Sequence, residues 1–132
     1  MYVSLFKLFK IGIGPSSSHT VGPINASLKF LSILKQNKID INSIQINLFG
    51  SLAYTGKGHG TDIGIIAGLL GHYPENVNIN QILNQYDEIK SSGFIPLHSI
   101  GLVRFDSNKN IFFSKESRKE FKYSNAIEFI AG

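Results

Sequence analysis

The sequence predicts an α+β domain in which helices pack on a mainly antiparallel sheet. Apolar residues recur at helical spacing in three segments, whereas elsewhere they alternate with polar residues or form short runs that favour strands. The resulting order is helix, strand, helix, helix and then strands, which differs from the regular alternation of a parallel fold. With 132 residues, of which 42% are hydrophobic, the chain is long enough to bury a core. We therefore expect one domain over residues 1–132.

The first helix is predicted over residues 17–36, with Pro23 in its early turns. Its apolar residues at helical spacing are Ile24, Leu28, Leu31 and Leu34. Residues 43–49 then alternate between apolar and polar side chains, which predicts a half-buried strand. The residues on the apolar face of this strand are Ile44, Ile46 and Leu48.

Two further helices are predicted. Thr61 or Asp62 caps the first of them, which is apolar on two faces and is therefore expected between a sheet and another element. The second is amphipathic and ends at Ser91-Ser92-Gly93. Its apolar residues are Ile79, Ile82, Leu83, Tyr86 and Ile89.

Short β-prone runs predict strands at residues 100–105, 110–114 and 127–131, and the polar residues 106–109 predict a hairpin loop between the first two. At the N-terminus, Lys7 and Lys10 interrupt the apolar residues and no signal-peptide cleavage site follows. We therefore expect a short packed segment there and a cytoplasmic protein.

Charge and cysteine content exclude several classes of function. Lys and Arg number 13 against 9 acidic residues, and the lysines are scattered rather than gathered in a basic stripe, so we expect no nucleic-acid partner. No apolar stretch is long enough for a membrane helix, so we expect no membrane partner. With no cysteine, this chain alone offers no disulfide, no thiolate metal site, no cysteine nucleophile and no ligand for an iron-sulfur cluster.

A first cluster of polar residues lies where the first helix is predicted to begin, between Gly14-Pro15 and Gly22-Pro23. Side-chain donors, free backbone N–H groups and the positive end of the helix dipole meet there, which suits a carboxylate or a phosphate. A capping serine accounts for one such residue but not for five in succession. The five residues are Ser16, Ser17, Ser18, His19 and Thr20.

A second cluster is the glycine-rich segment from Gly50 to Asp62. Its spacing fits neither a P-loop nor a dinucleotide fingerprint, but its glycines allow a ligand to approach the backbone closely. Around them lie Lys57, His59, Thr61 and Asp62. His59, with Asp62 nearby, is a candidate general base with an orienting partner. We expect His72 and His98 to be surface or satisfied residues instead.

Residues 13–23 and 50–62 resemble the two signature segments of the β domain of bacterial iron-sulfur L-serine dehydratases, also called L-serine ammonia-lyases. The resemblance implies deamination of L-serine to pyruvate and ammonia. It also implies a four-iron, four-sulfur cluster (4Fe-4S) held by cysteines of a separate α domain or subunit, and a homo-oligomeric full enzyme. In fold, the β domain of the family is similar to the allosteric substrate-binding domain of phosphoglycerate dehydrogenase.

The resemblance also assigns roles to residues. It implies that His59 is an acid or base near the serine, and that Ser16, Ser17, Ser18, His19 and Thr20 help to bind substrate or shape the cleft between the domains. Lys57, Thr61 and Asp62 are expected substrate-binding residues beside them. The chain departs from the family at Tyr123, where the family usually has histidine. Tyrosine does not replace histidine in proton transfer at neutral pH unless its pKa is strongly lowered. Either that histidine is dispensable, or this copy is impaired.

Two alternatives remain open. The chain is either a free-standing sensor that binds L-serine or another small anion without chemistry of its own, or a remnant of a longer gene. The departure at Tyr123 and the absence of cysteine both favour the sensor slightly.

Overall fold

The computed structural model describes residues 7–13, 21–38, 41–49, 61–113 and 125–132. In chain order these residues form β1 (Lys7–Ile13), α1 (Val21–Gln36), β2 (Ile44–Phe49), α3 (Thr61–Leu69), the 3-10 turn η1 (Pro74–Asn76), α4 (Ile79–Ser92), β3 (Phe94–Leu97), β4 (Gly101–Arg104), α5 (Ser107–Asn110), β5 (Ile111–Phe113) and β6 (Asn125–Ala131).

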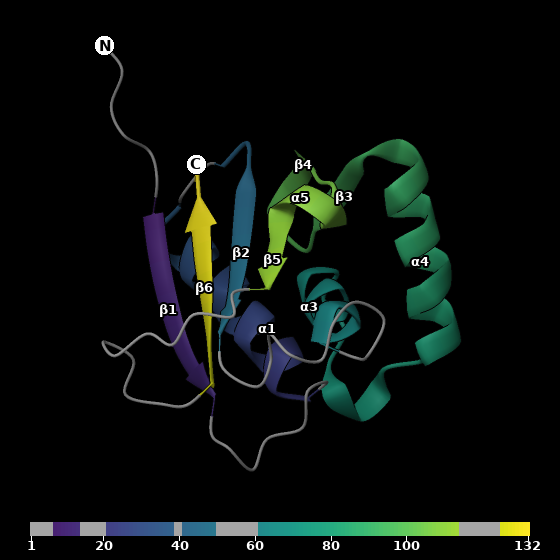
Figure 1. Cartoon of the computed structure of the whole chain (residues 1–132), viewed down its shortest axis with the longest axis horizontal. Coiled ribbons are helices and arrows are strands. Elements are labelled where there is room, and N and C mark those ends of the chain that lie inside the picture. The colour runs from purple at the N-terminus through teal and green to yellow at the C-terminus, as the bar shows by residue number, and fades with distance from the viewer. Residues whose placement is uncertain (1–6, 14–20, 39–40, 50–60, 114–124) are drawn as a thin grey trace.

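The main sheet has four strands in the order β1-β6-β2-β5 (Figure 1). The last strand of the chain, β6, lies in its interior and runs antiparallel to both β1 and β2, whereas β5 runs parallel to β2. A separate two-stranded sheet consists of β3 and β4, which are antiparallel. Helices on a mainly antiparallel sheet confirm the predicted α+β class.

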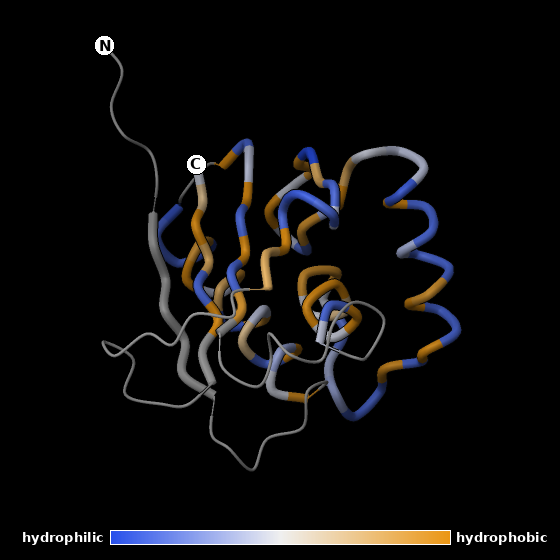
Figure 2. The backbone as a smooth tube through the Cα atoms, in the orientation of Figure 1, coloured by the Kyte–Doolittle hydropathy of each residue, from blue (hydrophilic) through white to orange (hydrophobic). Residues whose placement is uncertain are grey.

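The core lies between the main sheet and α1. Ile46 and Leu48 of β2 are fully buried, as are Ile127 and Phe129 of β6, so the predicted alternation of β2 is confirmed. The ring of Phe30 in α1 stacks on Phe129 with 4.5 Å between ring centroids. Figure 2 shows the same alternation as changes of colour along the strands. This stack fixes α1 against the centre of the sheet.

The second predicted helix, α3, is buried on almost every side. Of its residues only Ile63 is partly exposed, and α3 contacts both α1 and α4 (Figures 1 and 2). Its side chains also join the core cluster that contains the β2 and β6 residues. The prediction of a helix enclosed between two layers is therefore confirmed, with α4 as the outer layer.

Helix α4 ends at Ser92 before Gly93, as predicted, and the structure also shows how it begins. The Asn78 side chain accepts a hydrogen bond from the Gln81 N–H at 3.1 Å, which caps the start. Gly93 adopts the left-handed conformation, and its N–H donates to the Ile89 carbonyl at 2.8 Å. Two of its five apolar residues, Ile79 and Leu83, are exposed rather than packed in the core. The buried stripe of this helix is thus narrower than its sequence pattern.

The prediction of a hairpin loop at residues 106–109 is wrong. Residues Ser107–Asn110 form the short helix α5, and the flanking strands lie in different sheets, because β4 pairs with β3 and β5 pairs with β2. The Asp106 side chain accepts a hydrogen bond from the Asn108 N–H at 2.9 Å, which favours the helical turn. The Asn110 side chain then donates to the Ile44 carbonyl at 2.8 Å and holds the turn beside β2.

The sequence analysis did not predict two strands, β1 and β3. β3 begins directly after Gly93, and its partner is β4 rather than β5. At the N-terminus, the expected packed segment contains β1, which starts at Lys7 and pairs with β6. The first helix ends at Gln36 as predicted, and its described part starts at Val21, with residues 17–20 outside the described ranges.

Gly68 permits a close approach between α3 and α1. A Cβ atom at this position would lie 2.6 Å from the Ile24 carbonyl oxygen and 2.6 Å from the Ser27 Cβ. Ser27 is fully buried at this contact, and its hydroxyl has no hydrogen-bond partner in the described part of the chain. The two helices therefore meet through small side chains, and any larger side chain would separate them.

We expect Gly68→Ala to destabilise the domain. The added methyl group must push α1 away, and this overpacking outweighs the better helix propensity of alanine for a net loss of about 1 kcal/mol or more. Urea unfolding measures the change. Ser27→Ala is the matched control, because it keeps the Cβ atom and removes an unpaired buried hydroxyl, so its stability should rise or stay equal. An unfolding midpoint of Gly68→Ala at or above that of the wild type would contradict the steric argument.

Candidate functional site

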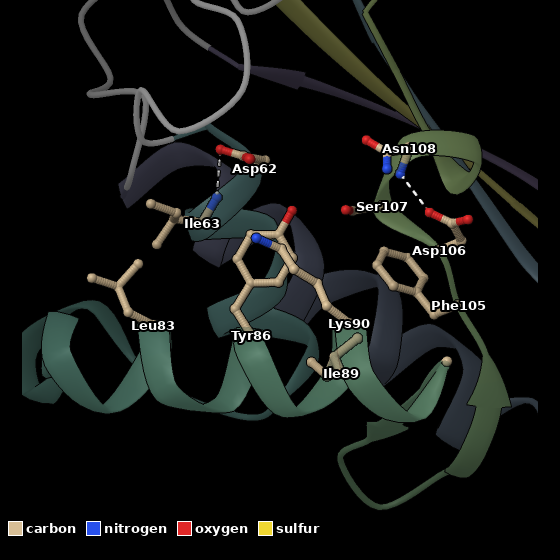
Figure 3. Close-up of a pocket in the computed structure, with 11 residues that line it drawn as sticks. Asp62, Ile63, Leu83, Tyr86, Ile89, Lys90, Phe105, Asp106, Ser107 and Asn108 are labelled. Carbon is tan, nitrogen blue, oxygen red and sulfur yellow. Dashed lines mark hydrogen bonds between the residues drawn. The ribbon is translucent and has the colours of Figure 1, made fainter.

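A cavity of about 640 Å³ lies between the start of α3, the inner face of α4 and the segment that links β4 to α5 (Figure 3). Leu83, Ile89 and Phe105 contribute apolar lining. The polar lining consists of Asp62, Tyr86, Lys90, Asp106, Ser107 and Asn108. Apolar walls with a few converging polar groups are typical of sites for small molecules.

Asp62 is the buried charge of this cavity. It lies in the first turn of α3, is 2% exposed, and its Oδ1 atom accepts a hydrogen bond from the Ile63 N–H at 3.0 Å. The positive end of the helix dipole favours a carboxylate in this turn. Thr61 and Asp62 both lie inside the described part of the helix, so the prediction that one of them is the cap is wrong. Asp62 nevertheless satisfies one of the N–H groups that a helix start leaves free.

Tyr86 projects from α4 toward Asp62 and Ser107 (Figure 3). Burial raises the pKa of its phenol above the ordinary value of 10.0, and hydrogen bonding to Ser107 opposes this rise. The nearby carboxylate of Asp62 raises the pKa further, because a second negative charge there is unfavourable. A side-chain hydrogen bond with Asp62 raises the pKa as well, so Tyr86 is neutral at physiological pH.

Lys90 brings the positive charge. It lies one turn after Tyr86 on α4, and its Nζ atom is 4.3 Å from the centroid of the Tyr86 ring, as expected for a cation–π contact. The side chain is exposed, so its ammonium group remains accessible to solvent and ligand. The negative and positive groups of the cavity are therefore provided by different elements of the fold.

Asp106 organises the remaining wall. Its side chain accepts from the Asn108 N–H at 2.9 Å, and its backbone N–H donates to the Asn110 side chain at 2.7 Å. These two bonds close the turn that starts α5 and place Ser107, which is 7% exposed, beside the cavity. The rigid turn thus presents a hydroxyl group opposite α3 and α4.

Of the residues predicted for the site, the structure describes Thr61 and Asp62. Asp62 lines the cavity, whereas Thr61 is fully buried and is not part of the lining. The other predicted residues lie outside the described ranges, so their roles stay predictions. They are Ser16, Ser17, Ser18, His19, Thr20, Lys57 and His59, together with Tyr123.

Sequence reasoning missed Tyr86, Lys90, Asp106 and Ser107. Tyr86 lies on the predicted apolar stripe of α4 and is buried there, but its hydroxyl group, which needs a partner, also lines the cavity. Lys90, four residues later, was a visible signal on the same helix face. A hairpin loop was predicted at residues 106–109, and such a loop gave no reason to expect Ser107 in the same cavity as Asp62 of α3.

His72 and His98 behave as expected. The Nε2 atom of His72 is 2.9 Å from the Gln85 side-chain oxygen, so this histidine is satisfied. His98 is exposed, and its side chain lies beside Gly71, where an added Cβ atom would be 2.5 Å away. Neither residue lines the cavity.

Within the described ranges, no group of three or more His, Asp or Glu side chains gathers in a geometry that could hold a metal ion. The whole sequence lacks cysteine, so it has no thiolate for an iron-sulfur cluster. In the same ranges, none of the helices has the length and hydropathy needed to cross a bilayer.

Comparison with known proteins finds similarity to serine dehydratases by a family model and by individual relatives. A family model described as serine dehydratase beta chain matches residues 4–132, which include both polar segments. The chain is 42% identical over 117 residues to an L-serine dehydratase of Haemophilus influenzae, an alignment that covers 86% of this chain and 26% of that protein. It is 45% identical over 117 residues to L-serine dehydratase TdcG of Escherichia coli, with the same coverage of 86% and 26%. An L-serine dehydratase of Helicobacter pylori is 36% identical over 124 residues, or 94% of this chain and 27% of that protein. The chain thus spans about a quarter of the length of these relatives.

We expect ionisation of the Tyr86 phenol to lower the free energy of unfolding at alkaline pH. Because its pKa is raised in the folded state, its contribution is complete below the unfolded pKa of 10.0 and is lost as pH rises through the higher folded pKa. The free energy of unfolding, measured by urea titration between about pH 9 and about pH 11, should therefore fall less steeply in Tyr86→Phe than in the wild type. Equal slopes for the two proteins would contradict the assigned environment of the phenol.

Proposed function

We propose, because this chain belongs to the family of serine dehydratase beta chains, that it is the β domain or subunit of an L-serine ammonia-lyase. The assembled enzyme converts L-serine to pyruvate and ammonia, and this chain alone is inactive. The observation that carries the proposal is the family match over residues 4–132, which spans both signature segments. The identity of 42% to 45% with named L-serine dehydratases supports it.

The proposed cofactor, a 4Fe-4S cluster, does not fit this chain. Such a cluster is held by cysteine thiolates, and the sequence contains none. The ligands therefore belong to a cysteine-containing α domain or subunit, which we propose as the partner. We assign to this chain only the tasks that its own side chains perform, namely binding the substrate, orienting it and moving a proton.

His59 is the proposed acid or base. Conversion of L-serine to pyruvate removes a proton from the α-carbon and the hydroxyl group from the β-carbon, so a base must lie near the α-carbon. Histidine suits this task at neutral pH. Asp62 follows His59 by three residues, and its carboxylate lies at the wall of the cavity. A carboxylate in that position supports an orienting role toward the histidine.

The first signature segment is the proposed site for the substrate carboxylate. Its residues 16–20 directly precede α1, whose described part starts at Val21 and extends for 16 residues. A helix of this length presents free N–H groups and a partial positive charge at its start. The segment is therefore suited to an anion, with Lys57 of the second segment as an additional cation.

A second candidate function is binding of a small molecule without chemistry. The observations that favour it slightly are the absence of cysteine and the departure from the family at Tyr123. A module of this kind would not need an α domain to hold its ligand.

The decisive experiment is reconstitution. The chain is combined under anaerobic conditions with a cluster-loaded α domain, and pyruvate formation from L-serine is followed. We expect activity only when both parts are present, because the proposed acid or base lies on this chain and the cluster ligands lie on the α domain or subunit. No gain over the α domain alone would refute the enzymatic proposal and favour the binding module.

His59→Ala tests the proton-transfer role. In the assembled enzyme we expect kcat to fall by about a hundredfold or more, as is typical when a general acid or base is removed. His98→Ala is the matched control, because His98 is exposed and does not line the cavity. Normal turnover in His59→Ala would exclude His59 as the acid or base.

A further inference from the structure

A separate cavity of about 230 Å³ lies between α4 and the β3–β4 hairpin, which follows α4 directly in the chain (Figure 1). It shares only Ile89 with the cavity at Asp62. Its volume is several times the roughly 30 Å³ share of one water molecule, so it has room for a side chain. We call it the hairpin groove. Its walls are Gln85, Glu88 and Ser92 from α4 and Phe94, Pro96 and Leu102 from the hairpin.

The hairpin presents an apolar face to solvent beside this groove. Its inner face is buried in the core, whereas Phe94, Pro96 and Leu102 are exposed. Pro96 and Leu102 are paired in register, so they lie side by side on the same face. Leu102 is 66% exposed, the largest exposed fraction among the large hydrophobic side chains that the structure describes. An exposed leucine that adjoins other apolar side chains and a groove is typical of a contact surface for another protein.

The two sides of the groove carry opposite charges. Glu88 is exposed on α4, and Arg104 is exposed on β4. Arg104 is paired in register with Phe94, and its guanidinium carbon lies 5.8 Å from the centroid of the Phe94 ring. Arg104 therefore lies on the same outer face as the apolar residues. Within the described ranges, neither the Glu88 nor the Arg104 side chain forms an ion pair, so both charges are available to a partner.

We propose that two copies of this chain associate through this surface around a two-fold axis. Leu102 of each copy enters the hairpin groove of the other, and Arg104 of each copy pairs with Glu88 of the other. In a two-fold dimer the same patch meets itself, so the patch must carry its own complement. This surface does so, because it combines a projecting leucine with a groove and a positive with a negative charge. The inference goes beyond the enzymatic proposal and does not depend on it.

The size of the surface sets the expected strength of the dimer. A few apolar side chains and two symmetric ion pairs make a small interface, and small interfaces are typical of weak association. Burial of Leu102 in the groove supplies most of the affinity, because it removes apolar surface from water. The two ion pairs at the rim mainly fix the orientation of the copies. We therefore expect a dimer that dissociates on dilution.

Sedimentation equilibrium of the full chain over a range of concentrations tests the association. We expect a reversible equilibrium between one and two copies, and Leu102→Ser should weaken it about tenfold by removing the apolar contact. Tyr73→Ser is the matched control, because Tyr73 is also an exposed apolar side chain but lies outside the groove, so the equilibrium should not change. A single species with the mass of one chain up to about 1 mM would overturn the inference.

Exchange of the two charges tests the orientation. Glu88→Arg and Arg104→Glu each place like charges opposite one another in the proposed dimer, so each should weaken it. The double variant restores opposite charges and should recover the affinity of the wild type. Glu75→Arg is the matched control, since it changes the net charge by the same amount as Glu88→Arg but lies outside the groove. Weakening in both single variants without recovery in the double variant would refute the pairing of Glu88 with Arg104.

A different occupant of the groove would give a different result. If the chain stays monomeric and Leu102→Ser instead weakens its binding to the α domain of the proposed enzyme, the groove belongs to that partner and the two-copy inference is wrong. The enzymatic proposal is judged separately, by pyruvate formation on reconstitution. Failure of that reconstitution together with a dimer that Leu102→Ser weakens would refute the enzyme and keep the interface.

Discussion

The contact between α1 and α3 is the constraint on which the rest of the structure depends. Gly68 contributes no side chain to this contact, and a single methyl group there would lie 2.6 Å from the Ile24 carbonyl oxygen. Phe30 ties α1 to the sheet through its stack on Phe129. Because each signature segment leads directly into one of these helices, their close packing sets where both segments join the folded core.

The cavity depends on the same arrangement. Once α3 is held against α1, its outer side faces α4, and Asp62 comes to lie near Tyr86. Almost all residues of α3 are buried by neighbouring elements. Only its first turn borders the cavity, and the polar residue that it contributes there is Asp62. The turn at Asp106 closes the third wall because Asn110 is bonded to the Ile44 carbonyl of β2. The main sheet thereby positions a site that lies outside it.

The proposed reaction divides into tasks for this chain and tasks for its partner, according to the side chains that each provides. Under the proposed function, this domain without cysteine provides carboxylates, hydroxyls, histidine and lysine for binding an amino acid and moving protons, and the proposed partner provides the soft thiolate ligands. Such a division requires the two parts to meet at the substrate.

Local patterns in the sequence determined the helices α1, α3 and α4, the alternating face of β2, the end of α4 at Gly93 and the choice of candidate residues in both signature segments. These features depend on residues close to one another along the chain, so periodicity and turn chemistry suffice to predict them. Tertiary structure alone decided that β5 joins β2 instead of β4, that β6 enters the middle of the sheet, and that Tyr86, Lys90 and Ser107 surround Asp62. Each of these outcomes depends on pairing or packing between distant segments, and the local sequence around Asp106 was equally compatible with a loop. Distant contacts therefore brought Asp62, at the end of one polar motif, together with an ordinary amphipathic helix and the turn at Asp106 in one candidate site.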